Sequence, residues 1–254
     1  MKIKFLIAIC ISFAFFGCKK EVKTTYTFDD TSDKAYLKVI HVVSNALVTP
    51  TSAAIAPVNV YLDGEKINGT PVTAGSGVYP GLEFAAVKSG AAVSMNVKMF
   101  TGATTPEVDI LTKSISLEKG GLYSAFLTDT IPTADVLLVK EDLSAVADSG
   151  KYFIRFVNLT PLSAGYDLYA TTDLAMAFTN VPYKTASPFI QLPVGSGARS
   201  FGIRRTGVAT NLATASVTPV AGRMYTIISY GIDGGTGVRV VKPAFYTTRF
   251  QTPL

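Results

Sequence analysis

The residue types that most often carry chemistry are scarce in this chain. Its 254 residues include one histidine, His41, two cysteines and no tryptophan. A nucleophilic triad needs a basic partner, and the single histidine lies inside an apolar stretch, where a packed or edge position on a strand is expected. One histidine and two cysteines also exclude the usual zinc ligand sets. We therefore expect no catalytic residues, no metal site and no cofactor.

Cysteine usage also limits how the fold is stabilised. Cys10 lies in an N-terminal apolar run and Cys18 follows the glycine that ends that run, so the remainder of the chain has no thiol and no disulfide. The folded part must depend on its hydrophobic core, which 48% apolar residues can supply. Twenty-one glycines and thirteen prolines favour strands and turns over helices.

Runs of positive charge and long apolar segments are missing too. The chain has 23 Lys and Arg against 18 Asp and Glu, and without Lys2 and Lys4 the balance is 21 against 18, a net charge of +3. No run of Lys and Arg exceeds two residues, which gives nucleic-acid binding little electrostatic support. The only long apolar run, Phe5–Phe16, is shorter than the roughly 20 residues that cross a bilayer.

The N-terminus has the order of a secretory signal peptide. Two lysines precede the run Phe5–Phe16, which stops at Gly17. Because Cys18 follows that small residue, the segment resembles a bacterial lipoprotein signal, in which the cysteine is lipidated and becomes the new N-terminus. Lys19, with no Asp at that position, resembles the outer-membrane destination; the periplasmic and surface-exposed sides both remain open. The alternative is an ordinary signal peptide with an incidental cysteine.

The rest of the chain predicts an all-β protein. Residues 18–34 are polar, without an apolar period, and indicate a flexible tether on the lipid anchor. The segment Val58–Leu62 alternates apolar and polar residues, and Asp63-Gly64 closes it with a tight hairpin turn. The other strands expected before the midpoint are Tyr36–Val43, Ala91–Phe100, Ile110–Leu117, Leu122–Leu127 and Ala134–Lys140.

The strand pattern then starts again. Tyr152–Asn158, Tyr166–Tyr169, Ser200–Arg205 and Gly222–Ile228 repeat Tyr36–Val42, Val58–Tyr61, Ser94–Met99 and Gly121–Phe126. Val157 or Phe156 takes the place of His41 in this alignment. A hairpin at Asp233–Gly235 and a last strand Val238–Val241 are expected to end the second copy. The pattern predicts two tandem immunoglobulin-like antiparallel β-sandwich domains, residues 35–142 and 150–254, after a signal peptide (1–17) and a tether (18–34).

The repeated segments also carry a family resemblance. Ile154–Pro161 followed by Tyr166–Tyr169 resembles the opening of the domain of unknown function 4397 (DUF4397) family. Val39–Asn45 with Ala56–Gly64 resembles the same opening with a longer connection, and Val181–Gly195 is similar to the family's next segment. The resemblance covers most of the chain from Tyr36 to Val241. It implies a bacterial cell-envelope β-sandwich module with no catalytic residues to transfer.

Two groups of residues are candidates for binding. The aromatic residues Tyr166, Tyr169, Phe178, Tyr183 and Phe189 could form a sugar-stacking or protein-binding surface, or could fill the sandwich core. Tyr183 and its neighbour Lys184 are the preferred binding residues, because flanking prolines exclude their segment from a central strand. The acidic residues Asp29, Asp30 and Asp33 are interpreted as a solvated part of the tether, since no loop of calcium-binding spacing surrounds them.

These observations predict a non-enzymatic, lipid-anchored envelope protein with a structural, adhesive or ligand-binding role. Its expected partners are the membrane, through Cys18, and an envelope protein or a glycan, with no nucleic acid. One alternative is an accessory lipoprotein that captures glycans for an outer-membrane uptake system. A hydrolase is the alternative from another class, and it lacks a recognisable base, metal set or nucleophile.

Overall fold

The chain folds almost entirely as β-strands in a computed structural model that describes residues 32–47, 49, 52, 54–75 and 77–250. These described residues form one compact unit. No helix among the described residues has the length and apolar character needed to cross a bilayer. The proposed signal peptide, Cys18 and nearly all of the tether lie outside the described residues.

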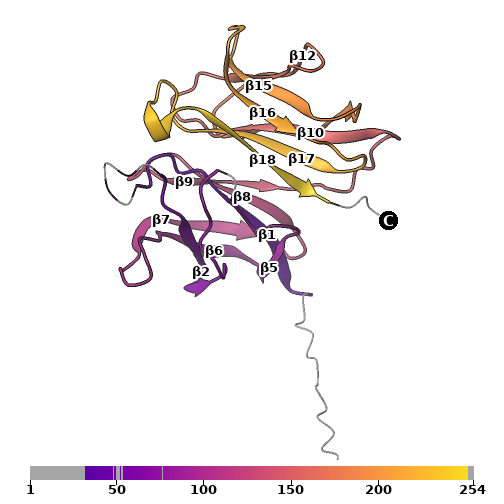
Figure 1. Ribbon diagram of the computed structural model, residues 1–254. Helices are drawn as coiled ribbons and strands as arrows, with labels where there is room; N and C mark the ends of the chain where they lie inside the picture. Colours follow the sequence, from indigo (N-terminus) through magenta and orange to yellow (C-terminus); the bar gives the residue numbers. More distant parts are fainter. Residues whose placement is uncertain (1–31, 48, 50–51, 53, 76, 251–254) are drawn as a thin grey trace, which may run out of the picture. The chain divides into compact units, whose positions relative to one another are not determined.

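The first copy contains nine strands in two sheets (Figure 1). Their bounds are β1 Lys34–His41, β2 Val58–Leu62, β3 Glu65–Lys66, β4 Val78–Tyr79, β5 Ala85–Lys88, β6 Gly90–Met99, β7 Val108–Leu117, β8 Leu122–Thr128 and β9 Asp135–Lys140. One sheet has the order β4-β1-β8-β9, with β5 also paired to β1, and the other has the order β3-β2-β6-β7. Asp63 and Gly64, both at positive φ, make the predicted hairpin turn between β2 and β3.

The second copy repeats this plan. Its elements are β10 Lys151–Asn158, β11 Tyr166–Ala170, β12 Ala175–Val181, β13 Thr185–Ala186, β14 Ile190–Pro193, β15 Arg199–Arg205, β16 Asn211–Val217, β17 Met224–Tyr230, the 3₁₀ turn η1 Gly237–Arg239 and β18 Lys242–Arg249. One sheet has the order β13-β10-β17-β18, with β14 also paired to β10, and the other has the order β12-β11-β15-β16. The prediction of two tandem β-sandwiches is confirmed, with one parallel pair in each copy, β1 with β8 and β10 with β17.

Each sandwich has its own apolar core. The first core lies between the two sheets of the first copy and includes Leu37, Val60, Val97 and Leu127. The second core lies between the sheets of the second copy and is more aromatic. A tyrosine hydroxyl supports each core in the same way, because Tyr123 accepts a hydrogen bond from a backbone N–H five residues upstream, and so does its counterpart in β17. This bond resembles the tyrosine corner of immunoglobulin-like domains.

A third apolar cluster joins the copies. Its buried members come from β1 and β8 on one side and from β10, β17 and β18 on the other, with one residue directly after each first strand. They are Ile40, Val42, Phe126, Val157, Leu159, Ile228 and Tyr246. We call β4-β1-β8-β9 and β13-β10-β17-β18, with β5 and β14, the inner sheets, and the other two the outer sheets. Both faces of each inner sheet are thus covered, and every residue of β10 after Lys151 is buried.

The strand registers correct the alignment of the two copies. In the parallel pairs, Lys38 lies opposite Ser124, and Arg155 lies opposite Thr226. Arg155 is therefore the counterpart of Lys38, and three residues further along the counterpart of His41 is Asn158. The expected match to Val157 or Phe156 was wrong by one or two positions, because apolar residues fill this strand on both faces and offer no alternation to align.

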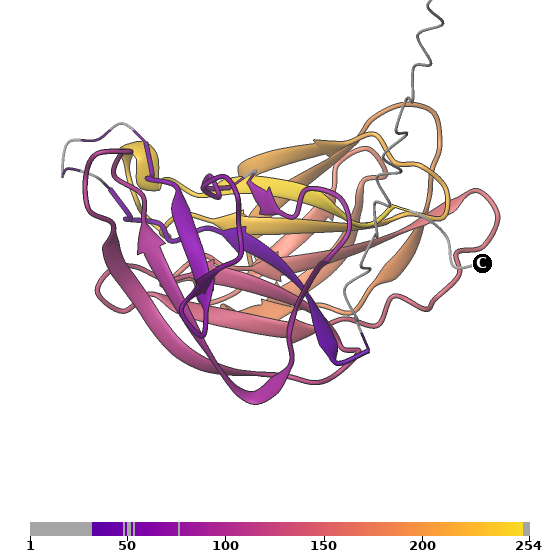
Figure 2. The ribbon, with the colours of Figure 1, turned by 90° about the horizontal axis from the view of Figure 1, so that it is seen from below.

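The end of the second copy also differs from expectation. The predicted strand Val238–Val241 is wrong, since the 3₁₀ turn η1 covers its first two residues and the last strand is β18, which begins at Lys242. β18, the yellow C-terminal strand, pairs with β17 along its whole length (Figures 1 and 2). β18 contains Pro243 and is an edge strand, where a missing N–H is tolerated.

Candidate functional site

His41 is fully buried at the end of β1, as the apolar pattern predicted. Its Nδ1 accepts a hydrogen bond from the N–H of Val43 at 3.4 Å, and its Nε2 donates to the carbonyl of Ala56 at 3.0 Å. Burial lowers the pKa of His41 to about 4, against the opposing effect of the hydrogen bond to Ala56. A neutral imidazole with both nitrogens engaged is a structural group.

Asn158 makes the same pair of bonds in the second copy. Its Oδ1 accepts from the N–H of Thr160, two residues later, and its Nδ2 donates to the carbonyl of Val181. Ser229 also donates its hydroxyl to Asn158 Oδ1 at 3.0 Å. His41 and Asn158 thus occupy equivalent positions, and each side chain hydrogen-bonds the turn after the first strand of its own sandwich.

Tyr183 and Lys184 lie where the second copy meets the first. The Lys184 ammonium pairs with Asp129 at 2.5 Å and Asp135 at 2.9 Å, both in or next to the β8–β9 turn. The hydroxyl of Tyr183 is buried, and burial and Asp129 raise its pKa above the usual range. Both side chains are half-buried, so they do not form an open surface, although a binding role for them stays a prediction.

Asp135 is the centre of this ionic contact. Partial burial would raise its pKa, but hydrogen bonds from the ammonium groups of Lys113 and Lys184 outweigh burial and lower the pKa to about 2. Lys113 Nζ lies 2.6 Å from one carboxylate oxygen and Lys184 Nζ lies 2.9 Å from the other. The two cations come from different copies, so Asp135 holds the copies together at this point.

A buried ion pair holds the copies together at a second point. Arg155 in β10 binds Glu141, directly after β9, through two hydrogen bonds of 2.8 and 2.5 Å, and both side chains are almost fully buried. Arg155 also donates to Thr226 at 2.8 Å, and its guanidinium lies 4.7 Å from the ring centroid of Phe189. The pair lines an open pocket of about 370 Å³. Since each charge already has its partner, this pocket offers little free polar chemistry.

Lys38 occupies the equivalent position in the first copy and is also fully buried. Its Nζ donates to the carbonyl of Leu82 and lies 5.0 Å from the ring centroid of Phe84. Burial lowers the pKa of Lys38 to about 8, although Glu83 and Glu141 both act to raise it. The residue contributes a cation to the junction of the copies rather than to a surface.

The outer sheet of the first copy carries a tyrosine–cation pair with its own carboxylates. Lys98 Nζ lies 5.3 Å from the ring centroid of Tyr61 and 3.6 Å from a carboxylate oxygen of Asp109. The hydroxyl of Tyr61 donates to Glu107 at 2.7 Å, and the amide of Asn59 donates to the same carboxylate. Burial would raise the pKa of Glu107, but these two hydrogen bonds lower it below the usual value. The cation and both carboxylates of this cluster therefore already have partners within the first copy.

The outer sheet of the second copy repeats the tyrosine–cation pair without those carboxylates. The Arg204 guanidinium lies 3.6 Å from the ring centroid of Tyr169, and its Nε donates to Asn211 at 2.6 Å. Among the ion pairs of the described residues, none involves Arg204. Both residues are half-buried on a sheet face and form no ion pair, and we take this pair as the candidate binding site.

The aromatic residues flagged in the sequence therefore divide between core and surface. Tyr166 is fully buried and Phe178 packs against the second core, whereas Tyr169 faces outward beside Arg204. Sequence reasoning missed the Tyr169–Arg204 pair, although the repeat contained the signal, since Tyr61 and Lys98 stand at the equivalent positions. Within the described residues, no group of three His, Cys, Asp or Glu side chains could hold a metal ion. Asp29 and Asp30 lie outside those residues.

Comparison with known proteins places the chain in a family without an assigned activity. No curated protein matches. Among solved structures, the chain is similar to the Bacillus anthracis TIE protein, at 14% sequence identity and a TM-score of 0.23, over 83% of this chain and 34% of that one. The chain spans about a third of that protein, and a similarity at this level says nothing about function. The family described as Domain of unknown function (DUF4397) matches residues 35–169 and 153–243, and the chain therefore belongs to that family.

Proposed function

We propose that this protein is a non-enzymatic, lipid-anchored protein of the cell envelope, attached through Cys18 to the outer membrane. Its two sandwiches act as one rigid body that presents the outer sheets to a partner. The observation that carries the proposal is the junction between the copies, where an apolar cluster is combined with the Arg155–Glu141 ion pair and the contacts of Lys184.

The junction favours display over catalysis for a physical reason. Pockets for small ligands often lie between domains, and such a pocket needs a few polar groups that are free to bind the ligand. Here Arg155 and Lys184 are paired with carboxylates of the first copy, and His41 is held in a turn with a pKa of about 4. A general base that works near neutral pH needs a pKa near the working pH. The outward faces of the two outer sheets are then the surfaces left for function.

Capture of a glycan is the second candidate, and one observation favours it. The Arg204 guanidinium stacked on Tyr169 is an open hydrogen-bonding group on a sheet face. Binding to a glycan would serve either an adhesive role or an uptake system. Neighbouring genes for an outer-membrane transporter and polysaccharide-degrading enzymes would favour uptake.

The anchor is tested by lipid labelling and fractionation of cells that express the full-length chain. We expect wild type to incorporate labelled fatty acid and to partition into the detergent phase, because two or more acyl chains hold a protein on a bilayer almost permanently. Cys18→Ser should lose the label and either leave the membrane fraction or remain unprocessed. Cys10→Ser, inside the apolar run, is the matched control and should behave as wild type. A Cys18→Ser protein of mature size in the membrane fraction would refute the anchor.

A further inference from the structure

The two outer sheets differ in the residues that face the cation from its two neighbouring strands. In the first copy Lys98 pairs in register with Asp109, and in the second copy Arg204 pairs with Asn211. An amide thus replaces the carboxylate that faces the cation. The loop before β7 also supplies Glu107 to Tyr61, whereas the equivalent loop, residues 206–210, contains no acidic residue. On the other neighbouring strand the exchange is reversed, because Asn59 faces Lys98 and Asp167 faces Arg204. On the β7 side the first copy therefore has a carboxylate beside the cation, and on the equivalent β16 side the second copy has an amide.

Arg204 has free hydrogen-bonding capacity where the missing carboxylate would lie. Its only hydrogen bond within the described residues runs from Nε to Asn211, which leaves both Nη groups without a protein acceptor. A guanidinium binds a carboxylate best through two parallel N–H donors in one plane. Because the Tyr169 ring lies against the flat face of the guanidinium, the donor edge is held in a fixed direction.

Asp167 is the carboxylate that faces Arg204 from the neighbouring strand β11. It lies opposite Arg204 in register, but it is 3% exposed and accepts hydrogen bonds from Asn180, Thr206 and Gly207. Its oxygens thus bind strand β12 and the loop after β15, and they make no ion pair with Arg204. Asp167 screens part of the positive charge, and the Nη edge stays open to a second carboxylate.

The charge of the second copy attracts anions over a longer range. Residues 150–254 contain ten Lys and Arg against three Asp and Glu, a net charge of +7. Residues 35–142 contain seven against ten, a net charge of −3. The small excess of the whole chain hides this division between the copies. A field of one sign raises the local concentration of oppositely charged ligands and speeds their association.

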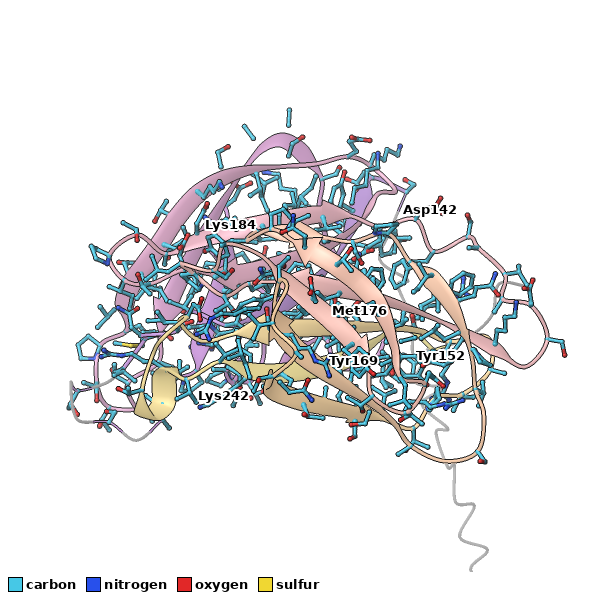
Figure 3. The ribbon with its side chains drawn as sticks, turned by 90° about the horizontal axis from the view of Figure 1, so that it is seen from above. Asp142, Tyr152, Tyr169, Met176, Lys184 and Lys242 are labelled. Carbon is cyan, nitrogen blue, oxygen red and sulfur yellow. The ribbon has the colours of Figure 1, made fainter. Side chains whose placement is uncertain are left out.

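The remainder of this face fits a sugar polymer better than a protein. The side chains that share the face with Arg204 on β15 and β16 are hydroxyls and an amide, from Ser200, Asn211, Thr214 and Ser216. Met176, opposite Tyr169, is an exposed large apolar residue there, at 47% (Figure 3). A stable protein interface needs an apolar centre and at least about 1,000 Å² of buried area. Hydroxyl and amide groups around a single arginine suit the hydroxyls of a sugar.

We propose that the outer sheet of the second copy binds an acidic polysaccharide, with a uronate carboxylate on the Nη edge of Arg204. That carboxylate takes the place that Asp109 and Glu107 fill within the first copy. The inference deepens the binding role in the proposed function and rests on it. It does not depend on the lipid anchor, because binding is measured on detergent-extracted protein and anchoring is measured in cells.

The test uses the full-length chain in non-ionic detergent and polygalacturonate as the uronate probe. Wild type should bind polygalacturonate, weakly at high salt, and should not bind neutral dextran. Arg204→Gln should weaken binding roughly tenfold or more, as expected for loss of a charge-assisted bidentate contact. Asn211→Asp, which supplies the missing carboxylate within the chain, should weaken binding several-fold without removing the arginine. Lys98→Gln is the matched control in the first copy and should leave binding within about twofold of wild type.

Three results would overturn the proposal. Wild type that does not bind polygalacturonate would remove the uronate ligand. Equal binding by wild type, Arg204→Gln and Asn211→Asp, with unchanged urea unfolding midpoints, would place binding elsewhere. Stronger competition by polyglutamate than by polygalacturonate would assign the face to an acidic protein. If Arg204→Gln fails to fold, Asn211→Asp still decides, since its substitution preserves size and shape.

Discussion

His41 gives the sharpest test of how this fold depends on pH. The side chain is fully buried and neutral, and it joins the turn after β1 to Ala56 through two hydrogen bonds. In His41→Gln, the side-chain amide keeps an N–H donor at about the distance of Nε2 from the backbone. His41→Asn places at this position the residue found at the equivalent position of the second copy, Asn158. Neither replacement can take up a proton. Both variants therefore remove the titration and leave a polar group in the turn.

The magnitude follows from the two pKa values. His41 has a pKa of about 4 in the folded protein and about 6.5 when unfolded. Above pH 6.5 neither state is protonated. As the pH falls from 6.5 to 4, the unfolded chain binds a proton that the folded protein refuses, so the free energy of unfolding decreases. At about 1.36 kcal/mol for each unit of pKa difference, the loss is about 2 kcal/mol between pH 7.5 and pH 5 and about 3 kcal/mol in all.

The assay is urea unfolding of the full-length chain in non-ionic detergent, followed by circular dichroism at pH 7.5, 6 and 5. We expect His41→Gln to be about 1 kcal/mol less stable than wild type at pH 7.5, through imperfect packing. The difference should shrink or reverse at pH 5, because only wild type loses stability through this residue. Asp135, with a pKa of about 2, titrates below the assay range and affects both proteins equally. Parallel stability curves for wild type and both variants would refute a buried, neutral His41.

Two further predictions test the junction of the copies by urea unfolding. Arg155→Met should lower the free energy of unfolding by about 3–5 kcal/mol, because it leaves the carboxylate of Glu141 buried without a partner. Adding Glu141→Gln should recover much of that loss. Equal losses in the single and double variants would contradict a buried pair. Gly75→Ala should cost more than Gly64→Ala, since both glycines have φ near +80° but only a methyl group at Gly75 would overlap the hydroxyl of Tyr230 in the other copy. Equal costs, near the roughly 1 kcal/mol expected for backbone strain alone, would mean that the copies do not touch there.

Local patterns in the sequence were enough for most strands and for the repeat. Val58–Leu62 was predicted to the residue, because a half-buried strand alternates with period two and Asp63-Gly64 fits only a tight turn. The two-copy arrangement followed from self-similarity, and the family match supports it. The lipid anchor and tether remain predictions, since they lie outside the described residues.

The candidate site shows where local patterns stop being informative. The preferred residues Tyr183 and Lys184 were chosen because prolines bound their segment, and that segment does lie at the edge of an inner sheet. Their exposure depended on whether the other copy lies against that edge, which no local pattern contains. Tyr169 and Arg204 are 35 positions apart in the chain and meet only because β11 and β15 pair in a particular register.

The sequence by itself determined ten of the strands, the turn at Asp63-Gly64 and the tandem repeat, because these depend on the alternation of neighbours and on glycine at positive φ. Only the tertiary structure decided which strands pair in parallel, that the inner sheets share an apolar cluster, and that β18 forms the last edge despite Pro243. β10 is buried along almost its whole length, so it shows a continuous apolar run. Such a run indicates that both faces are covered. What covers the second face is fixed by long-range packing, and here it is the other copy.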